Sequence, residues 1–260
     1  MEEKMSTEII TISDIHSHIL PRFDDGSKSS VESVAMLSSL YDQGVRRVVA
    51  TPHFYANKDE PCEFIETRDS TAKHLADKIE SILEEEGRDA CAMPSVYLGA
   101  EVMFFNAMSM CSELEKMCIS GTKYLLVEMP FDKWTSAMVQ ELRLIMAKYG
   151  ITPIIAHVER YFQYFRQEML DEMIKEGMLI QSNAEAFLGI WTRKRALKLL
   201  EDGKIHLLGS DAHNMERRAP KIKEALAAIE KKLGTAPIEK LCENSEKILS
   251  TATPIWTPGR

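Results

Sequence analysis

Short runs of β-branched and apolar residues alternate along the chain with segments of helical spacing, and this alternation constrains the fold more than any other feature. The runs predict strands at 9–15, 46–50, 96–99, 124–129, 151–156, 179–182 and 206–209. The segments between them predict helices near 31–41, 65–86, 106–117, 136–149, 167–176, 192–201 and 220–233. Seven strands, each followed by a helix, indicate a parallel α/β fold, either a barrel or an open sheet.

Every predicted strand ends in, or is followed by, a side chain that can bind a metal or form hydrogen bonds. In chain order these side chains are Asp14, His16, His18, His53, Glu101, Glu128, His157, Arg160, Asn183, Asp211 and His213. The C-terminal ends of the strands are where (β/α) barrels carry their active sites. This placement therefore favours the barrel over the open sheet, and it predicts that the side chains share one site.

The first strand sets Asp14, His16 and His18 at alternate positions in the stretch TISDIHSHIL. Residues two apart in a strand point to the same side, so these three side chains converge. Two imidazoles and a carboxylate are costly to bury unless they bind something, either a metal ion or a hydrogen-bond network. The polar residues at the other strand ends favour a shared site that several strands build together.

The composition suits one large globular domain. The chain has 260 residues, of which 45% are hydrophobic and 28% charged, and no linker, low-complexity tract or internal repeat divides it. We therefore expect residues 1–260 to form a single domain, with a barrel over about 9–249. Residues 250–260, with Trp256 between prolines, are expected to be either a loose tail or a strap across the barrel.

The charge and the cysteine content of the chain indicate its cellular location and exclude one class of partner. The net charge of −8, without a compensating basic run, argues against nucleic-acid binding. Five cysteines without a C-x-x-C pair are typical of free thiols in a reducing cytoplasm. The N-terminus lacks the apolar region of a signal peptide, and no apolar run approaches the roughly 18 residues of a membrane span. We therefore expect a cytoplasmic protein without membrane insertion.

Seven short motifs occur in order along the chain: H-x-H at His16, DDGSKS, TPH, GAE, VE, AHVER and SDAHN. Together they resemble the polymerase-and-histidinol-phosphatase (PHP) superfamily over residues 11–249. Within it the chain is most similar to the bacterial manganese-dependent protein-tyrosine phosphatases of capsular and exopolysaccharide operons. The resemblance implies a distorted (β/α)7 TIM-like barrel that holds two or three divalent metal ions.

The resemblance also implies a set of metal ligands, namely His16, His18, Asp25, His53, Glu101, Glu128, His157, Asp211 and His213. Asp25 rather than Asp24 matches the family's aspartate because it directly precedes the glycine. Five imidazoles and four carboxylates, without a thiolate, suit manganese, iron or zinc, and the resemblance favours manganese. Nine side chains exceed what one ion can use, so a cluster is expected, with Glu101 as the candidate bridging carboxylate.

Two arginines match residues that contact substrate phosphate in the resembled family. The first is Arg160, and the second follows SDAHN, where the spacing from His213 and the proline that comes next favour Arg218 over Arg217. The implied reaction is hydrolysis of phosphotyrosine by a metal-activated hydroxide, while both arginines hold the phosphate oxygens. The proton for the leaving group is expected from Asp211, His213 or a metal-bound water.

The implied enzyme is a phosphotyrosine-protein phosphatase whose partner is a bacterial tyrosine autokinase acting in capsular or exopolysaccharide synthesis. A small-molecule phosphatase, such as a histidinol-phosphate phosphatase, would share the barrel and the metals and is the alternative. A metal-binding module without turnover is a third interpretation, which the full ligand set and the two arginines disfavour.

Cys62 and Arg68 show the C-x₅-R spacing of cysteine-dependent tyrosine phosphatases. Two glutamates and no glycine lie between them, so a helix start is expected there instead of a phosphate-binding loop. His74 is expected at the surface, and His206 at the N-terminal end of the last strand, where barrels carry stability rather than catalysis.

Three polar residues near the site are given supporting roles. Asp14 is expected to orient a ligand histidine, and Asp24 to shape its loop. Asn183 is expected to be either a spectator or a substrate contact. The methionine-rich stretch at 103–108 is expected to fill the core, with a substrate lid as the alternative.

Overall fold

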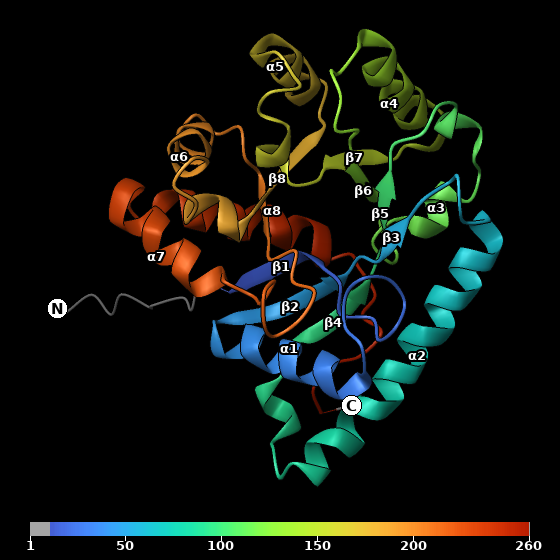
Figure 1. The fold of residues 1–260 in the computed structure, drawn as a ribbon, viewed down its shortest axis with the longest axis vertical. Coiled ribbons are helices and arrows are strands. Elements are labelled where there is room, and N and C mark those ends of the chain that lie inside the picture. The colour runs from blue at the N-terminus through green and yellow to red at the C-terminus, as the bar shows by residue number, and fades with distance from the viewer. Residues whose placement is uncertain (1–10, 260) are drawn as a thin grey trace, which may run out of the picture.

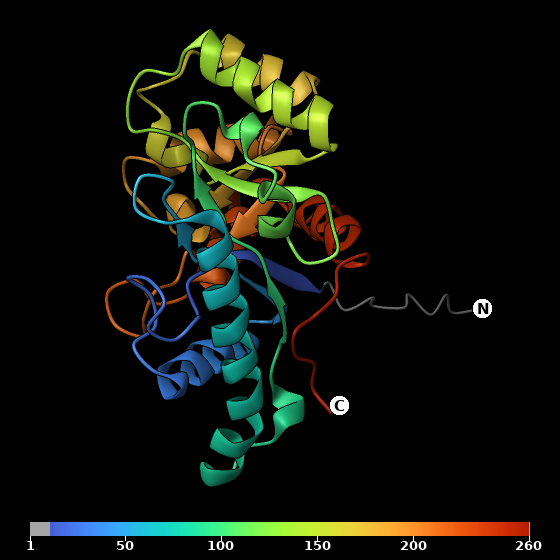
Figure 2. The same ribbon diagram turned by 90° about the vertical axis from the view of Figure 1, so that its right-hand side faces the viewer.

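The computed structural model describes residues 11–259, in which parallel strands form the centre and helices lie around them (Figure 1 and Figure 2). The strands are β1 (Ile12–Ser17), β2 (Val45–Ala50), β3 (His53–Phe54), β4 (Ser95–Leu98), β5 (Glu101–Met103), β6 (Tyr124–Glu128), β7 (Thr152–Ile155), β8 (Leu179–Asn183) and β9 (Leu207–Gly209). They form a three-stranded sheet in the order β1-β2-β4 and a six-stranded sheet in the order β3-β5-β6-β7-β8-β9.

Two strands of the barrel are interrupted half-way, which makes nine segments out of seven predicted strands. β2 ends at Ala50 and β3 resumes at His53, while β4 ends at Leu98 and β5 resumes at Glu101. The first halves pair with each other in one sheet, and the second halves pair in the other. The second halves, β3 and β5, begin with His53 and Glu101, and both residues are predicted metal ligands.

The barrel closes where the segment after β9 meets the end of β1. Ala212 forms a parallel bridge with Ser17, and the His18 N–H donates to the Ala212 carbonyl at 2.9 Å. The Asp211 N–H in turn donates to the His16 carbonyl at 2.8 Å. These bonds confirm the distorted (β/α)7 barrel, and they place the first and last predicted ligand pairs side by side.

In the described part of the chain, seven helices of nine or more residues surround the strands. They are α1 (Ser30–Asp42), α2 (Pro61–Glu85), α4 (Ser136–Tyr149), α5 (Gln167–Lys175), α6 (Arg193–Glu201), α7 (Ile222–Leu233) and α8 (Ala236–Leu249). A buried cluster takes Ile15, Val49, Leu126, Ile154 and Leu207 from five strands, and a larger one packs the helices against the sheet. Between residues 11 and 259, none of the helices has the length and apolar content to cross a membrane.

The predicted helix at 106–117 is wrong. The structure has a 3₁₀ turn at Met108–Met110 and a four-residue helix, α3 (Leu114–Met117), in its place. The Ser109 N–H donates to Glu141 Oε1 of α4 at 2.7 Å, and the Ser109 carbonyl accepts from Tyr149 Oη at 3.0 Å. Ala107 also takes a left-handed φ of 60°. Tertiary partners on α4 thus satisfy the backbone groups that a continuous helix would have used.

The other six predicted helices are present, and α2 begins at Pro61 rather than at residue 65. α8 was not predicted. It follows α7 after Gly234 and carries a proline in its first turn, where a missing N–H costs nothing. Met108 is fully buried, in line with core filling by the 103–108 stretch.

The C-terminal segment forms a strap on β4 and is not a loose tail. The Ile255 N–H donates to the Val96 carbonyl at 2.8 Å, and the Val96 N–H donates to the Trp256 carbonyl at 2.9 Å. The Thr253 N–H donates to the Ser120 carbonyl at 2.9 Å, and the Trp256 side chain is buried. The strap therefore covers the β4 end of the three-stranded sheet, where no further strand pairs.

Replacing Trp256 by alanine tests this strap. We expect Trp256→Ala to lower the free energy of unfolding by about 3 kcal/mol, because a large buried side chain and its packing are lost. Trp191→Ala is the matched control, since Trp191 is 93% exposed and its loss should change stability by less than about 0.5 kcal/mol. Equal effects of the two substitutions in urea unfolding would contradict a packed strap.

Candidate metal centre

The two histidines of the H-x-H motif point their Nε2 atoms at the same place. These atoms lie 3.2 Å apart at the end of β1, and both side chains are fully buried. On the other side of each ring, His16 Nδ1 lies 3.3 Å from Gln181 Oε1 and His18 Nδ1 lies 2.7 Å from Asp24 Oδ2. Oxygen acceptors at both Nδ1 atoms leave the Nε2 lone pairs free to face each other, an arrangement that a cation stabilises.

Glu101 is the residue on which the histidines converge. Its Oε2 atom lies 3.1 Å from His16 Nε2, 3.3 Å from His18 Nε2 and 3.0 Å from His53 Nδ1. Its Oε1 atom lies 2.8 Å from His157 Nε2. Because β5 begins at Glu101, the interruption of the third predicted strand brings this buried carboxylate to four histidines from three parts of the barrel.

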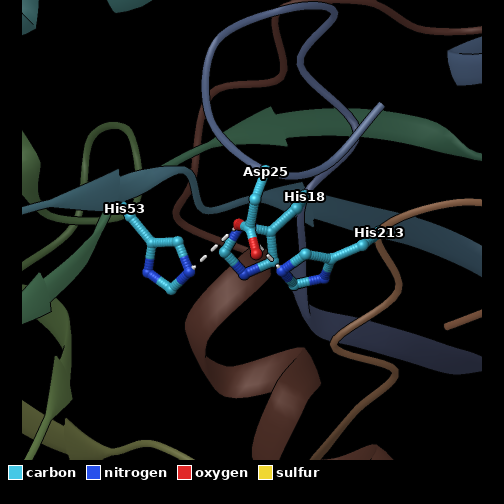
Figure 3. Close-up of side chains that lie close together, drawn as sticks. All are labelled: His18, Asp25, His53 and His213. Carbon is cyan, nitrogen blue, oxygen red and sulfur yellow. Dashed lines mark ion pairs between the residues drawn. The ribbon is translucent and has the colours of Figure 1, made fainter. Parts of the chain in front are cut away.

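A second group of donors lies toward the surface, around Asp25. Asp25 Oδ1 is 3.2 Å from His213 Nε2 and 3.5 Å from His53 Nε2, and the ring of His18 lies beside them (Figure 3). The Asp25 side chain is 64% exposed, unlike the deeper ligands. Gly26 allows the loop to pass here, because a Cβ atom at that position would lie 2.2 Å from the His18 carbonyl oxygen.

Glu128 and Asp211 complete the set of nine. Glu128 Oε1 lies 3.5 Å from His157 Nε2, and Asp211 Oδ1 lies 3.4 Å from His18 Nε2. The structure thus brings all nine predicted ligands into one neighbourhood. Three subsets hold donor atoms mutually within 4.8 Å: His18, Asp25, His53 and His213; His16, His18 and Glu101; and His53, Glu101 and Glu128.

Two of the nine residues have strained backbones. His157 takes φ 29° and Asp211 takes φ 51°, a left-handed region that residues other than glycine rarely occupy. Such conformations cost on the order of 1–3 kcal/mol each and collect at functional sites. Each is the second residue after a strand end, where the strained backbone turns the side chain from the strand toward the centre of the site.

The carboxylates and histidines hold one another in charged forms. Burial alone would raise the pKa of Glu101, but the neighbouring histidines hold it well below its usual range. Burial alone would lower the pKa of His157, but hydrogen bonds to Glu101 and Glu128 raise it to about 9. Burial and the charge on His18 lower the pKa of His213 to about 3. Protons on some histidines therefore balance the buried carboxylates wherever a cation does not.

Unpartnered buried atoms provide a test of whether the residues fit a metal. Among the described residues, seven buried side-chain nitrogen or oxygen atoms lack a hydrogen-bond partner, and they include His53 Nδ1, Glu101 Oε2, Glu128 Oε2 and His213 Nε2. Such atoms cost about 1–3 kcal/mol each when left unsatisfied. Four of the seven face other donors of the centre at 3.0–3.9 Å. Imidazole and carboxylate donors in this arrangement fit a cluster of divalent cations.

Asp24 does more than shape its loop. Its Oδ1 atom accepts from the Gly26 N–H at 2.9 Å, as a loop-shaping residue would. Its Oδ2 atom lies 2.7 Å from His18 Nδ1 and accepts from the His53 N–H at 3.1 Å. Asp24 therefore orients the His18 ring, a role that the sequence analysis gave to Asp14.

Asp14 contacts no histidine ring, so its expected role is wrong. Its carboxylate accepts from the Ser210 N–H at 2.7 Å, from Ser210 Oγ at 2.6 Å and from the His16 backbone N–H at 3.2 Å. Burial raises its pKa to about 6 against the opposing hydrogen bonds from Ser210. Asp14 thus ties β1 to the loop after β9 and helps to close the barrel.

Arg160 and Arg218 both reach Asp211 at the edge of the centre. Arg218 Nη2 lies 2.8 Å from Asp211 Oδ1, and Arg160 Nη2 pairs with Asp211 Oδ2. Both arginine side chains are about one-third exposed, whereas Arg217 is exposed. Asn183 Nδ2 donates to the same Asp211 Oδ2 at 2.8 Å, so this residue is not a spectator, and a contact with substrate stays a prediction.

Four residues for which no catalytic role is expected lie away from the centre, namely Cys62, Arg68, His74 and His206. Cys62 is exposed in the first turn of α2, while Arg68 is buried and donates to the backbone carbonyls of Gly99 and Lys116. They form no phosphate-binding loop. His74 is exposed on α2, and His206 Nδ1 accepts from the Ile180 N–H at 3.1 Å beside the start of β9.

Residues 12–250 match the model of the family described as "Capsular polysaccharide synthesis, CpsB/CapC". The chain belongs to this family. Tyrosine-protein phosphatase YwqE of Bacillus subtilis is 30% identical over 255 residues, covering 94% of each chain. Tyrosine-protein phosphatase CpsB of Streptococcus pneumoniae is 32% identical over 253 residues, covering 91% of this chain and 97% of the relative.

Two solved structures of other proteins agree with the fold. A crystal structure from work on YwqE and CpsB, described as metal-dependent tyrosine phosphatases, superposes with a TM-score of 0.77. It is 28% identical and covers 95% of this chain and 98% of the other. A phosphotriesterase homology protein from Escherichia coli, at 13% identity and a TM-score of 0.52, shares the fold alone.

Adding a divalent ion tests the fit of these residues. We expect Mn²⁺ at a hundredfold excess over its dissociation constant to raise the free energy of unfolding by about 2.7 kcal/mol, because the ion binds only the folded chain. Glu101→Gln should abolish this increase, since it removes a charge that contacts four histidines. Glu84→Gln, on the exposed face of α2, should keep it. A protein whose unfolding ignores Mn²⁺ would contradict a metal centre.

Proposed function

We propose that the chain is a metal-dependent phosphotyrosine-protein phosphatase. The observation that carries this proposal is the pairing of a nine-residue donor cluster, buried except at Asp25 and His53, with two arginines, Arg160 and Arg218, at its edge. Donors for cations and donors for phosphate oxygens thus lie side by side. Family members of similar length that are named tyrosine-protein phosphatases support the same activity.

The three donor subsets are proposed to hold two or three divalent ions, with manganese first and iron or zinc as alternatives. His18, His53 and Glu101 each belong to two of the subsets, which suits neighbouring ions that share ligands. When bound, such ions lower the pKa of water toward neutrality and offset negative charge on phosphate. His157 and Asp211 lie within reach of the shared carboxylate and imidazoles, and we propose them as further ligands.

Arg160 and Arg218 are proposed to hold the non-bridging phosphate oxygens. A guanidinium group presents a planar fork of donors that matches two oxygens at once. Both groups are part-exposed and already bound to a carboxylate, so each is aligned for an anion and still reaches solvent. As charge spreads over the phosphate oxygens in the transition state, these preset donors stabilise it without reorganising.

The leaving group of phosphotyrosine is a phenolate with a pKa near 10, so it departs more readily than an alkoxide. Asp211 and His213, two of the three expected proton sources, lie beside the other donors of the centre. Because the pKa of Asp211 lies well below its usual range and the pKa of His213 is lowered to about 3, we propose that the third expected source, a water held by the ions, would supply the proton. His213 Nδ1 lies 3.0 Å from the Asp211 carbonyl, which leaves its Nε2 atom on the side of the donors.

A cleft beside the centre supports the proposal that the substrate is an aromatic group on a polypeptide. It has a volume of about 580 Å³, opens on Asp25 and His53, and is also lined by Phe23, Tyr55 and Phe64. The Tyr55 ring stacks on His53 with centroids 5.1 Å apart. We propose that the tyrosine ring of the substrate lies against this wall while its phosphate lies between the metals and the arginines.

The protein substrate is proposed to be a bacterial tyrosine autokinase that acts in capsular or exopolysaccharide synthesis, and the reaction is proposed to take place in the cytoplasm. The family description, which refers to capsular polysaccharide synthesis, supports this setting.

Initial rates on two substrates test the proposed activity. Chelator-stripped protein, assayed with and without added manganese, should hydrolyse a phosphotyrosine peptide in preference to histidinol phosphate, and only with the metal. Preference for histidinol phosphate would retain the metal centre and overturn the substrate. No turnover of either by metal-loaded protein would overturn the phosphatase itself.

Neighbouring arginines offer a matched pair of variants. Arg218→Ala should lower kcat/KM for the phosphotyrosine peptide by about 10²-fold, because one preset donor to the transition state is lost. Arg217→Ala, which removes the same group from an exposed position, should leave the rate unchanged. Bound metal, measured by elemental analysis, should be equal in both. The reverse order of effects would assign the phosphate contact to Arg217.

A further inference from the structure

Gln181 lies where two of the proposed ligands meet, although sequence reasoning did not single it out. It occupies the middle of β8, and its side chain is fully buried. Gln181 Oε1 accepts a hydrogen bond from the His157 backbone N–H at 2.7 Å and lies 3.3 Å from His16 Nδ1. A single amide oxygen thus contacts ligand residues from β1 and from the segment after β7.

Hydrogen bonds to both the oxygen and the nitrogen of the Gln181 side chain fix the orientation of its amide. A backbone N–H can only donate, so the group facing His157 is the Gln181 oxygen and not its nitrogen. Gln181 Nε2 then donates to Asn183 Oδ1 at 3.0 Å, and Asn183 Nδ2 donates to Asp211 Oδ2 at 2.8 Å. A carboxylate can only accept, so the second amide is fixed as well. The chain of donors runs in one direction from Gln181 to Asp211.

This orientation decides which nitrogen of His16 carries a proton. Because Gln181 Oε1 can only accept, the contact at His16 Nδ1 requires an N–H there. The neutral ring then presents an unprotonated Nε2 atom, which lies 3.1 Å from Glu101 Oε2. An imidazole binds metal through its unprotonated nitrogen, and the partner of the other nitrogen sets which one that is.

Gly209 leaves the space that this contact needs. A Cβ atom at Gly209 would lie 2.7 Å from Gln181 Nε2 and 2.6 Å from His16 Cβ. Any larger residue would push apart the amide and the ring, although the backbone of Gly209 itself is not in a left-handed conformation. The glycine at the end of β9 therefore belongs to the same arrangement.

We propose that Gln181 is a positioning residue that sets the tautomer of His16 and so prepares its Nε2 atom for metal binding. It acts through His16 and touches no substrate. The inference goes beyond the proposed reaction and holds for any phosphate ester, while resting on the proposed metal centre.

Zinc-loaded protein, which is diamagnetic, allows a direct test by ¹⁵N NMR of the histidine rings. In the wild-type protein we expect zinc on Nε2 of His16 and a slowly exchanging proton on Nδ1. Gln181→Met keeps the length of the side chain and removes the acceptor, so this proton should exchange faster. Gln181→Glu keeps an acceptor and should retain the proton. This readout does not depend on catalytic activity.

Metal affinity provides the second readout, measured by competition with a chromophoric chelator. Gln181→Met should weaken Mn²⁺ binding by about 10–100-fold, and Gln181→Glu by less. Gln43→Met is the matched control, because Gln43 also bridges two elements through its amide, with Ser39 and Pro220 as acceptors. It should leave metal binding unchanged even if stability falls.

The outcomes separate positioning from general packing. Wild-type affinity in Gln181→Met, or the same loss in Gln43→Met, would overturn the proposal. Zinc on Nδ1 of His16 in the wild-type protein would also overturn it, and this measurement decides the question even if Gln181→Met does not fold. A substrate other than phosphotyrosine would overturn the proposed function and leave these results standing.

Discussion

The carboxylate of Glu101 is the group around which the centre of this barrel is organised. It is buried, yet it lies within 3.3 Å of nitrogens from His16, His18, His53 and His157. Removing a carboxylate from water costs several kcal/mol, which close opposite charges recover only in good geometry. Four imidazoles around one carboxylate supply that charge either as bound protons or as ligands of cations. The raised pKa of His157 and the lowered pKa of Glu101 show how strongly the two kinds of group depend on each other.

The interruptions of the barrel put these groups in reach. An uninterrupted strand would carry Glu101 past the end of β4 in the same sheet, paired with the continuation of β2. Instead the Glu101 N–H donates to the Pro52 carbonyl at 3.0 Å, the Gly99 N–H donates to the Ala50 carbonyl at 2.8 Å, and the chain turns between two sheets. Backbone hydrogen bonds from Gly99 and Glu101 thus continue across the gaps. The distortion lets two strands begin again with a predicted ligand.

The sequence predicted the parts of this site that depend on strand ends. Period-two spacing placed His16 and His18 on one side of β1. The C-terminal ends of the other predicted strands supplied the remaining donors except Asp25, which lies in the loop after β1, because all strands are parallel. The role of orienting a ligand ring was assigned to Asp14 instead of Asp24 because both are carboxylates close to histidines in sequence. Only the turn at Gly26 brings the Asp24 carboxylate to the His18 ring. Gln181 was missed because glutamine has no metal chemistry of its own. Its alternation with Asn183 along β8 was the available signal.

The prediction of a helix at 106–117 failed because contacts with another part of the chain decide the structure there. The stretch at 106–117 has helical spacing, but hydrogen bonds from α4 to Ser109 outweigh the local preference, and such partners are invisible in a single sequence. Spacing still served well where each helix packs its own apolar face, as α4 does over Ser136–Tyr149.

Asp211 lies where the proposed phosphate-binding and metal-binding roles meet in one small volume. Its Oδ1 atom lies near His18 and Arg218, while its Oδ2 atom accepts from Arg160 and Asn183. An arginine that turns toward a substrate phosphate therefore leaves the carboxylate with its second arginine, the Asn183 amide and the histidines. Because Asn183 is itself held by Gln181, the proposed function implies that the β8 amides would keep the carboxylate in place while an arginine changes partner. Arg160 and Arg218, which follow β7 and β9, are in that proposal the members of the site that would follow the substrate.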